Sequence, residues 1–487
     1  MAAITVNELG ETLLDQLNEI VNGGDDAVKP PKDTFVTWCQ PGLPFQAEDF
    51  DFCVKGLSGG KDAEEDRKLL QQAFNFSQLI DFVPNTDGIY KNEDQATVFR
   101  TSQARLSSMY GEILKLSKVV KSELSDEEKA ELEEFRGHLY TTKKEKNLVT
   151  KEETERTVDG PVLTAYKEKL AAYRDAVLKF NAKRIAAAAA TGPEGKAAVA
   201  DWQFNSEIYR AEVKQAADDW VAGGYQREVE QMTARINQVG LRDMTLWKQR
   251  LIEQYDRSRI AGMGPGQEFY FSTLFPGSFA TSTGWQNYSI QHTETESLQK
   301  SSRKKWSAGG GLKFGMFGAS GSASGSKEKF SKDFSLKDFK MSFEITQVLL
   351  SRPWMYPEFF TNRGWTLKPG DGWHFDTLPS DGGEPPQGNF IGYPTTALFI
   401  RNVKITSAEF VSEFDKMSKS LEAKGSAGWG PIRLKGSYGS SSSSQEFKAV
   451  TDKNTLTIPG MQVVGFINQL VGKAPNPAEG LKDSDFR

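Results

Sequence analysis

Residues 306–318 read WSAGGGLKFGMFG, and residues 425–439 read GSAGWGPIRLKGSYG. Both stretches run into a tract that is rich in serine and glycine. Each tract is followed by an apolar segment that begins at a methionine, Met341 or Met461. The two stretches start 119 residues apart and the two methionines lie 120 residues apart. This spacing predicts an internal repeat, whose unit is a strand, a Gly/Ser hairpin and a second strand.

The residues within both copies alternate as expected for strands, in which successive side chains point to opposite faces. In the first copy the even positions from Trp306 to Met316 are mostly apolar, and the odd positions are serine, glycine or Lys313. In the second copy the alternation places Ile432 and Leu434 on one face and Trp429 on the other. The candidate functional residues of the two hairpins are Trp306, Gly309, Gly311, Leu312, Phe314, Met316, Phe317, Gly428, Trp429, Ile432, Leu434 and Tyr438.

So many glycines in strands point to contacts between backbones. Each glycine costs about 0.5–1 kcal/mol in a strand, and strands retain glycine where backbones approach closely or where a sheet curves. Identical subunits could pair such hairpins edge to edge. We therefore expect a non-enzymatic protein that assembles with itself into a ring, tube or shell, so that its partner is another copy of the chain.

A second hypothesis places the hairpins in a membrane. A small Gly/Ser/Ala face opposite a thin apolar face resembles, in architecture, the hairpins of β-barrel pore-forming proteins such as perforin and the cholesterol-dependent cytolysins. This resemblance implies a pore-forming or membrane-remodelling activity, with lipid as the alternative partner. A strand that crosses lipid needs about 9–11 residues with an apolar band. The first copy meets this requirement marginally and the second copy is too polar.

The period of the hydrophobic pattern changes from helical to alternating at residues 262–266, which marks a domain boundary. The predicted class is α+β, with an N-terminal bundle of long helices and a mainly β C-terminal domain. The predicted parts are an N-terminal helix and irregular segment at 1–60, a helical bundle at 61–261, a β domain at 267–472 with repeats at about 288–350 and 405–470, and a polar tail at 473–487.

Helical spacing of apolar residues supports the bundle. Ser125 and Glu128 form the pattern of a capping box, which predicts a helix start there. The long helix that contains the alanine run 186–190 should end at Gly192-Pro193, because proline interrupts a helix. We therefore expect the chain to turn back there. The residues that we expect to face the bundle interior are Leu106, Ile113, Leu170, Val177 and Phe180.

Composition excludes several classes of protein. A net charge of −5 over 487 residues gives no nucleic-acid footprint. The first residues lack the pattern of a signal peptide, and no window is apolar enough for a membrane helix, so the expected location is the cytoplasm. Cys39 and Cys53 are expected to be reduced thiols in that compartment, although a disulfide between them stays open.

Candidate catalytic motifs are few. The three histidines, His138, His292 and His374, have no zinc-binding spacing and no accompanying nucleophile motif. Residues 56–61 echo a phosphate loop but lack its spacing and its preceding strand. We therefore predict no cofactor, metal or catalytic residue, leave a small-molecule ligand open, and rank an enzyme with an unrecognised site third.

Overall fold

The computed structural model describes residues 4–21, 33–84, 96–98, 104–121, 125–146, 153–188, 192–240, 243–264, 267–291, 314–320, 327–368, 370, 372–421, 425–437 and 446–487. The structure is 45% helix and 29% strand, so the predicted α+β class is confirmed. The chain forms two compact units. The first unit is Met1–Lys118 with Ser258–Leu481, and the second is Val119–Arg257 with Lys482–Arg487.

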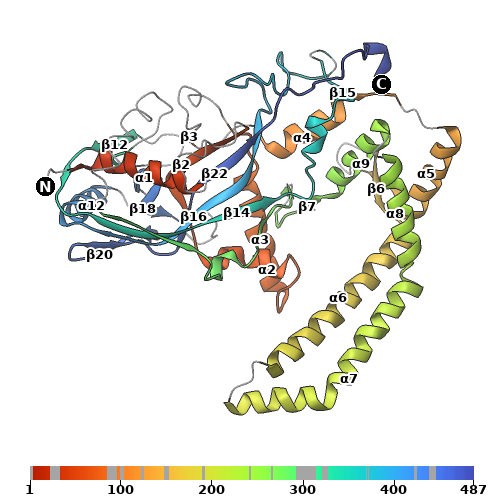
Figure 1. Cartoon of the computed structure of the whole chain (residues 1–487), viewed down its shortest axis with the longest axis horizontal. Helices are drawn as coiled ribbons and strands as arrows, with labels where there is room; N and C mark the ends of the chain where they lie inside the picture. The colour runs from red at the N-terminus through yellow and green to blue at the C-terminus, as the bar shows by residue number, and fades with distance from the viewer. Residues whose placement is uncertain are drawn as a thin grey trace. The chain divides into compact units, whose positions relative to one another are not determined.

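A nine-stranded sheet organises the described part of the first unit (Figure 1). Its order is β10-β14-β16-β22-β2-β3. In addition, β9 pairs with β14, β21 pairs with β16, and β20 pairs with β21. The pairs of its long strands are antiparallel, and β2 pairs with β3 in parallel. The strands are β2 (Thr34–Phe45), β3 (Ala96–Val98), β9 (Thr273–Phe275), β10 (Gln286–Gln291), β14 (Lys340–Ser351), β16 (Gly392–Thr406), β20 (Val450–Asp452), β21 (Thr455–Thr457) and β22 (Met461–Leu470).

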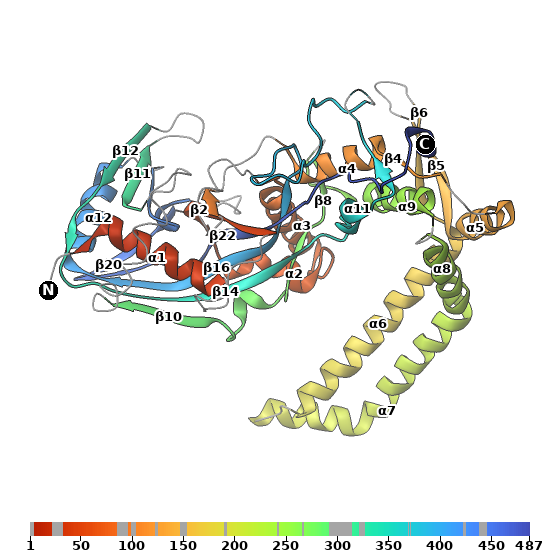
Figure 2. The ribbon, with the colours of Figure 1, turned by 45° about the horizontal axis from the view of Figure 1, so that its top comes forward.

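Both faces of this sheet are covered, because its side chains alternate between two apolar cores. On β16, Leu398 and Ile400 belong to one core, and Ala397 and Phe399 belong to the other. The first core contains the leucines of α1 (Val6–Val21), which lies beside β14 and β16 (Figures 1 and 2). The second core contains phenylalanines from η1 (Ala47–Phe50), α2 (Asp51–Lys55) and α3 (Ala63–Ile80).

A five-stranded sheet closes the first core from the other side. Its order is β12-β11-β17-β18-β19, so the described parts of both predicted hairpin copies lie in one sheet and meet where β11 pairs with β17. The equivalence of the two copies stays a prediction, because 301–313, 321–326 and 438–445 lie outside the described residues. The strands are β11 (Met316–Ser320), β12 (Lys327–Lys332), β17 (Ser426–Trp429), β18 (Ile432–Ser437) and β19 (Glu446–Lys448).

The alternation of the second copy predicted one continuous strand, but the structure shows a hairpin. The chain reverses at Gly430 and Pro431, so that Trp429 and Ile432 become partners across a hairpin. Gly430 allows this turn because its φ of 53° lies in the left-handed region that favours glycine. Trp429, Ile432 and Leu434 therefore all join the same core, although strict alternation had placed Trp429 on the opposite face.

The segment 30–60 was expected to be irregular or to hold only short strands, but residues 34–45 form one long inner strand, β2. Pro41 and Gly42, which contributed to that expectation, lie at an irregularity between Trp38 and Leu43, where the register with β22 shifts. There the Gly42 N–H donates to the Pro431 carbonyl at 2.9 Å. A Cβ at Gly42 would lie 2.7 Å from that oxygen, so the close approach requires glycine.

The described part of the second unit consists of helices and one β-ribbon. The capping box predicted at Ser125 is confirmed, because the Ser125 and Glu128 side chains each accept from the other residue's backbone N–H. The helices α6 and α7 lie side by side as an antiparallel pair (Figures 1 and 2). The elements are α5 (Asp126–Leu139), β5 (Tyr140–Lys146), β6 (Glu153–Asp159), α6 (Pro161–Ala188), α7 (Gly192–Gly223), α8 (Gln226–Gly240), α9 (Met244–Arg257) and η3 (Asp483–Asp485).

The structure divides the predicted bundle at 61–261. Helices α3 and α4 (Leu106–Leu116) belong to the first unit, so Leu106 and Ile113 are buried there. In the second unit Leu170, Val177 and Phe180 are only half-buried, because a pair of helices covers less of each stripe than a bundle does. Within the range predicted as a helical bundle, the threonine-containing segments β5 and β6 pair as an antiparallel ribbon instead of forming helices.

The remaining elements of the structure are short, apart from one helix. They are β1 (Ile4–Thr5), β4 (Lys118–Val119), β7 (Arg259–Ala261), β8 (Glu268–Tyr270), η2 (Phe279–Thr281), β13 (Ser335–Leu336), α11 (Glu358–Thr361), β15 (Trp365–Thr366) and α12 (Ala408–Ser420).

Candidate functional site

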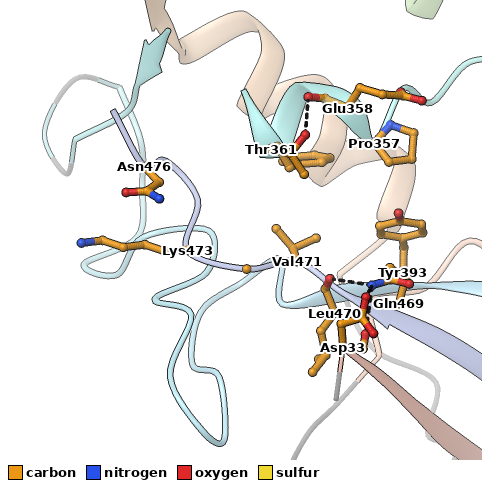
Figure 3. A pocket seen from close by; sticks show the side chains of 12 residues that line it. Asp33, Pro357, Glu358, Thr361, Tyr393, Gln469, Leu470, Val471, Lys473 and Asn476 are labelled. Carbon is orange, nitrogen blue, oxygen red and sulfur yellow. Dashed lines mark hydrogen bonds between the residues drawn. The ribbon is translucent and has the colours of Figure 1, made fainter. Parts of the chain in front are cut away.

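A pocket of about 560 Å³ opens at one end of the nine-stranded sheet, within the first unit (Figure 3). Its volume lies in the range of roughly 300–1,000 Å³ that is usual for small-molecule sites. Three walls surround it: the ends of β16 and β22, the short helix α11, and the chain that follows β22. The lining residues are Asp33, Pro357, Glu358, Phe360, Thr361, Tyr393, Gln469, Leu470, Val471, Gly472, Lys473 and Asn476.

The sheet positions the first group of polar side chains. Tyr393 on β16 and Gln469 on β22 are directly paired across the two strands. The strands come unusually close at the neighbouring Gly392, where a Cβ would lie 2.5 Å from the Gln469 carbonyl oxygen. Glycine is therefore needed beside Tyr393 to keep the two polar residues in register.

Asp33 is held at the pocket by Gln469 and by the end of β22. The Gln469 Nε2 donates to the Asp33 Oδ2 at 2.8 Å and to the Asp33 carbonyl at 3.0 Å. The Leu470 N–H donates to the same carbonyl at 2.7 Å. Gln469 therefore binds the Asp33 carboxylate through the oxygen Oδ2, as Figure 3 shows for this corner of the pocket.

An aromatic cluster holds the helix α11 in place. Glu358, at its first position, is exposed, whereas Phe359 and Phe360 are buried. The Phe359 and Trp365 rings stack at 4.8 Å, and Phe360 stacks on Phe390 at 4.6 Å. Rigid apolar anchoring of this kind presents Glu358 and Thr361 to the pocket from a fixed backbone.

The third wall is the segment after β22, which the sequence suggested was a polar surface tail. Its backbone is fixed, because Ser380 and Ala474 exchange two backbone hydrogen bonds at 3.0 and 3.2 Å. The Ser380 hydroxyl also donates to the Val471 carbonyl at 2.8 Å. Lys473 and Asn476 are exposed on this wall, on the opposite side of the pocket from Asp33 and Tyr393 (Figure 3).

The charges of the lining are separated. Burial raises the pKa of the Tyr393 phenol, and the carboxylate of Glu358 raises it further. The nearby Arg352 lowers this pKa, and Asp33 adds a smaller increase. The phenol is therefore a neutral hydrogen-bonding group at neutral pH. One side of the pocket carries the acidic groups Asp33 and Glu358, and the other side carries the ammonium of Lys473.

Arg352 is a buried cation close to this site. Its Nη1 donates to the Pro394 carbonyl at 2.6 Å, and its Nη2 donates to the Ile80 carbonyl at 3.2 Å. Burial lowers the pKa of the guanidinium to about 10, and Asp81 offsets part of this decrease. The charged form at neutral pH fixes the start of the loop that leads to α11.

The structure places the described hairpin residues in the core of the first unit rather than at a surface. Trp429 has no exposed surface, and its indole Nε1 donates to the Val6 carbonyl at 3.2 Å. At Gly428 a Cβ would lie 2.6 Å from the Pro41 Cβ, so the glycine serves close packing on β2. The buried or half-buried hairpin residues are Phe314, Met316, Phe317, Trp429, Ile432 and Leu434.

The other predicted hairpin residues, Trp306, Gly309, Gly311, Leu312 and Tyr438, lie outside the described residues. Nothing in the sequence pattern identified the pocket residues, because they come from four distant segments. The one available signal is the aromatic content of residues 352–394, which include Trp354, Trp365 and Trp373 and so indicate a loop that packs on another element. Cys39 and Cys53 are free thiols.

Searches of protein-family models, curated proteins and solved structures find no match to this chain. Within the described ranges no group of three or more His, Cys, Asp or Glu residues could hold a metal ion. None of the helices in the described part of the chain is both long and apolar enough to cross a membrane. The geometry of the pocket is therefore the basis for the functional argument.

Proposed function

We propose that the protein is a binding protein for a small zwitterion, a molecule with an ammonium group at one end and an anionic group at the other. The observation that carries this proposal is the separation of charge in the pocket. Asp33, Glu358 and Tyr393 lie on one side of the pocket, and Lys473 lies on the other (Figure 3).

Each side suits one end of such a ligand. A ligand ammonium donates hydrogen bonds to carboxylates, and the Tyr393 and Phe360 rings of the lining add favourable aromatic contact with a cation. A ligand carboxylate or phosphate accepts from the Lys473 ammonium and from the Asn476 amide. Leu470 and Val471 supply the apolar surface between the two ends.

Titration calorimetry tests the proposal with free amino acids and with O-phosphoethanolamine as probes. Ethylamine and acetate, each of which carries only one of the two charges, serve as ligand controls. We expect Glu358→Gln and Lys473→Gln each to weaken zwitterion binding about tenfold, or about 1.4 kcal/mol, because each removes one charged partner. The exposed Glu384→Gln should leave the affinity unchanged.

The two variants should also separate the two ends of the ligand. Glu358→Gln should weaken ethylamine as well as the zwitterions, and Lys473→Gln should weaken acetate as well as the zwitterions. Preference for amino acids would indicate a free metabolite, and preference for O-phosphoethanolamine would indicate a headgroup. Equal affinities in all three variants, or no heat with any probe, would refute the proposal.

Self-association is the second candidate, and a surface other than the hairpins favours it. Phe204 and Ile208 lie one turn apart on α7 and are 83% and 56% exposed. Side chains four residues apart share one helix face, so these two form an apolar patch. A second copy could cover it, since Phe204 of one α7 can pack on Ile208 of another in an antiparallel pair.

Light scattering after size-exclusion chromatography tests this candidate. The double change Phe204→Glu with Ile208→Glu should shift an oligomer to monomer, while Gln203→Glu with Gln215→Glu, at exposed polar positions of the same helix, should not. A monomer in all samples would exclude self-association through α7. The pore-forming hypothesis remains a proposal that dye release from liposomes would test.

A further inference from the structure

We infer that the second unit contains a separate binding site for a small molecule that has an aromatic, largely apolar body and one positive charge. The site is a groove of about 520 Å³ formed by α5, α6 and α8. It shares no residue with the pocket of the first unit and does not depend on the function proposed for that pocket.

The interior of the groove is apolar. Phe135 of α5, Val162 of α6 and Met232 of α8 line it, and Tyr225 stands before α8 with 45% of its surface exposed. Beneath them Leu139, Leu163 and Val229 form a buried cluster, on which Val162 and Met232 pack. The groove therefore has a packed base, as preformed ligand sites do.

The size of the groove favours a small molecule over a protein partner. Eight side chains line it, whereas a stable protein interface involves about 20–30 residues on each side. An aromatic ligand of drug-like size fits a volume of about 520 Å³.

The charges at the groove favour a cation. Arg235 is already paired, because its Nη2 donates to the Glu131 carboxylate at 3.1 Å. His138 lies 3.9 Å from the Glu134 carboxylate. Glu228 in the first turn of α8, in contrast, has no hydrogen-bond or ion-pair partner among the described residues. A ligand cation can therefore pair with Glu228 and contact the face of the Tyr225 ring.

Fluorescence titration of the full chain tests the inference with two aromatic dyes. Thioflavin T carries a positive charge, and 1-anilinonaphthalene-8-sulfonate carries a negative charge. We expect thioflavin T to bind more tightly than the anionic dye. Met232→Trp should reduce thioflavin T binding at least tenfold because the larger ring fills the groove, while Thr233→Trp, at an exposed position next to it, should not.

A further variant tests the charge. Glu228→Gln should weaken thioflavin T about fivefold to tenfold and leave the anionic dye unchanged or bound more tightly. Circular dichroism would show whether each variant keeps the helical content of the parent. Unchanged thioflavin T binding in a folded Met232→Trp protein would overturn the site, and equal binding of both dyes with no effect of Glu228→Gln would overturn the cationic class of ligand.

Discussion

The change Trp429→Phe distinguishes a core role for the second hairpin from the surface role that its sequence suggested. The indole lies in the core between the two sheets, with ring centroids 5.2 Å from Phe410 and 5.8 Å from Phe339. Its Nε1 donates to the Val6 carbonyl at 3.2 Å. Phenylalanine would keep most of the aromatic packing but lose this hydrogen bond and part of the filled volume.

The expected cost follows from these two losses. A buried hydrogen bond contributes about 0.5–1.5 kcal/mol net. The smaller ring forfeits the burial of roughly two carbon groups, which is about 1–2 kcal/mol. We therefore expect Trp429→Phe to lower the free energy of unfolding of the first unit by about 1.5–3.5 kcal/mol.

Urea denaturation of the full chain, followed by circular dichroism and tryptophan fluorescence, measures this difference. Two probes are needed because the two units can unfold in separate transitions. Val450→Ala, at a position that is 63% exposed, serves as the control and should change stability by less than about 0.5 kcal/mol. A loss below about 0.5 kcal/mol for Trp429→Phe, together with a change in particle size, would refute the core role and favour an assembly contact.

Three further changes test other parts of the structure. Burial raises the pKa of the Cys39 thiol, so the folded chain keeps a proton that the unfolded chain loses above about pH 8.5. The urea midpoint of the parent should therefore fall as the pH rises beyond that value. The midpoint of Cys39→Ala should fall less steeply. Gly392→Ala would place a Cβ 2.5 Å from the Gln469 carbonyl, so calorimetry should show weaker zwitterion binding and denaturation a loss of about 1–3 kcal/mol. Hydrogen bonds from neighbouring side chains lower the pKa of Asp201 to about 2, so the thermal stability of the second unit should decline as the pH falls from about 3.8 towards 2. Asp201→Asn should reduce that decline in a melting series, whereas Glu207→Gln on the exposed face of α7 should leave it unchanged.

Local sequence was sufficient for the helices because their signals lie within a few residues. The start of α5 at Asp126 follows from the reciprocal bonds of Ser125 and Glu128, which are three positions apart. The N-terminal helix expected within residues 1–60 corresponds to α1, whose leucines recur at helical spacing and are buried. The same spacing could not show that α3 and α4 belong to the first unit and not to a bundle. An apolar stripe shows which face of a helix is buried but not what covers it.

The strands and turns show the opposite case. The irregular appearance of residues 30–60 reflected local proline and glycine content, whereas β2 exists because it pairs with β22 at the other end of the chain. Similarly, the alternation in residues 425–439 was read as one strand, although the turn at Gly430 brings both halves onto one core. The stabilising partners in both cases come from distant sequence.

By itself the sequence determined the α+β class, the positions of the long helices and the apolar character of the two hairpin stretches, because propensity, capping and periodicity act over short distances. The tertiary structure alone decided that the apolar hairpin residues fill a core and that a pocket exists. Asp33 and Gln469, which meet at that pocket, are 436 positions apart in the chain. No local pattern encodes their contact, since it arises only when β2, β16 and β22 pair in register.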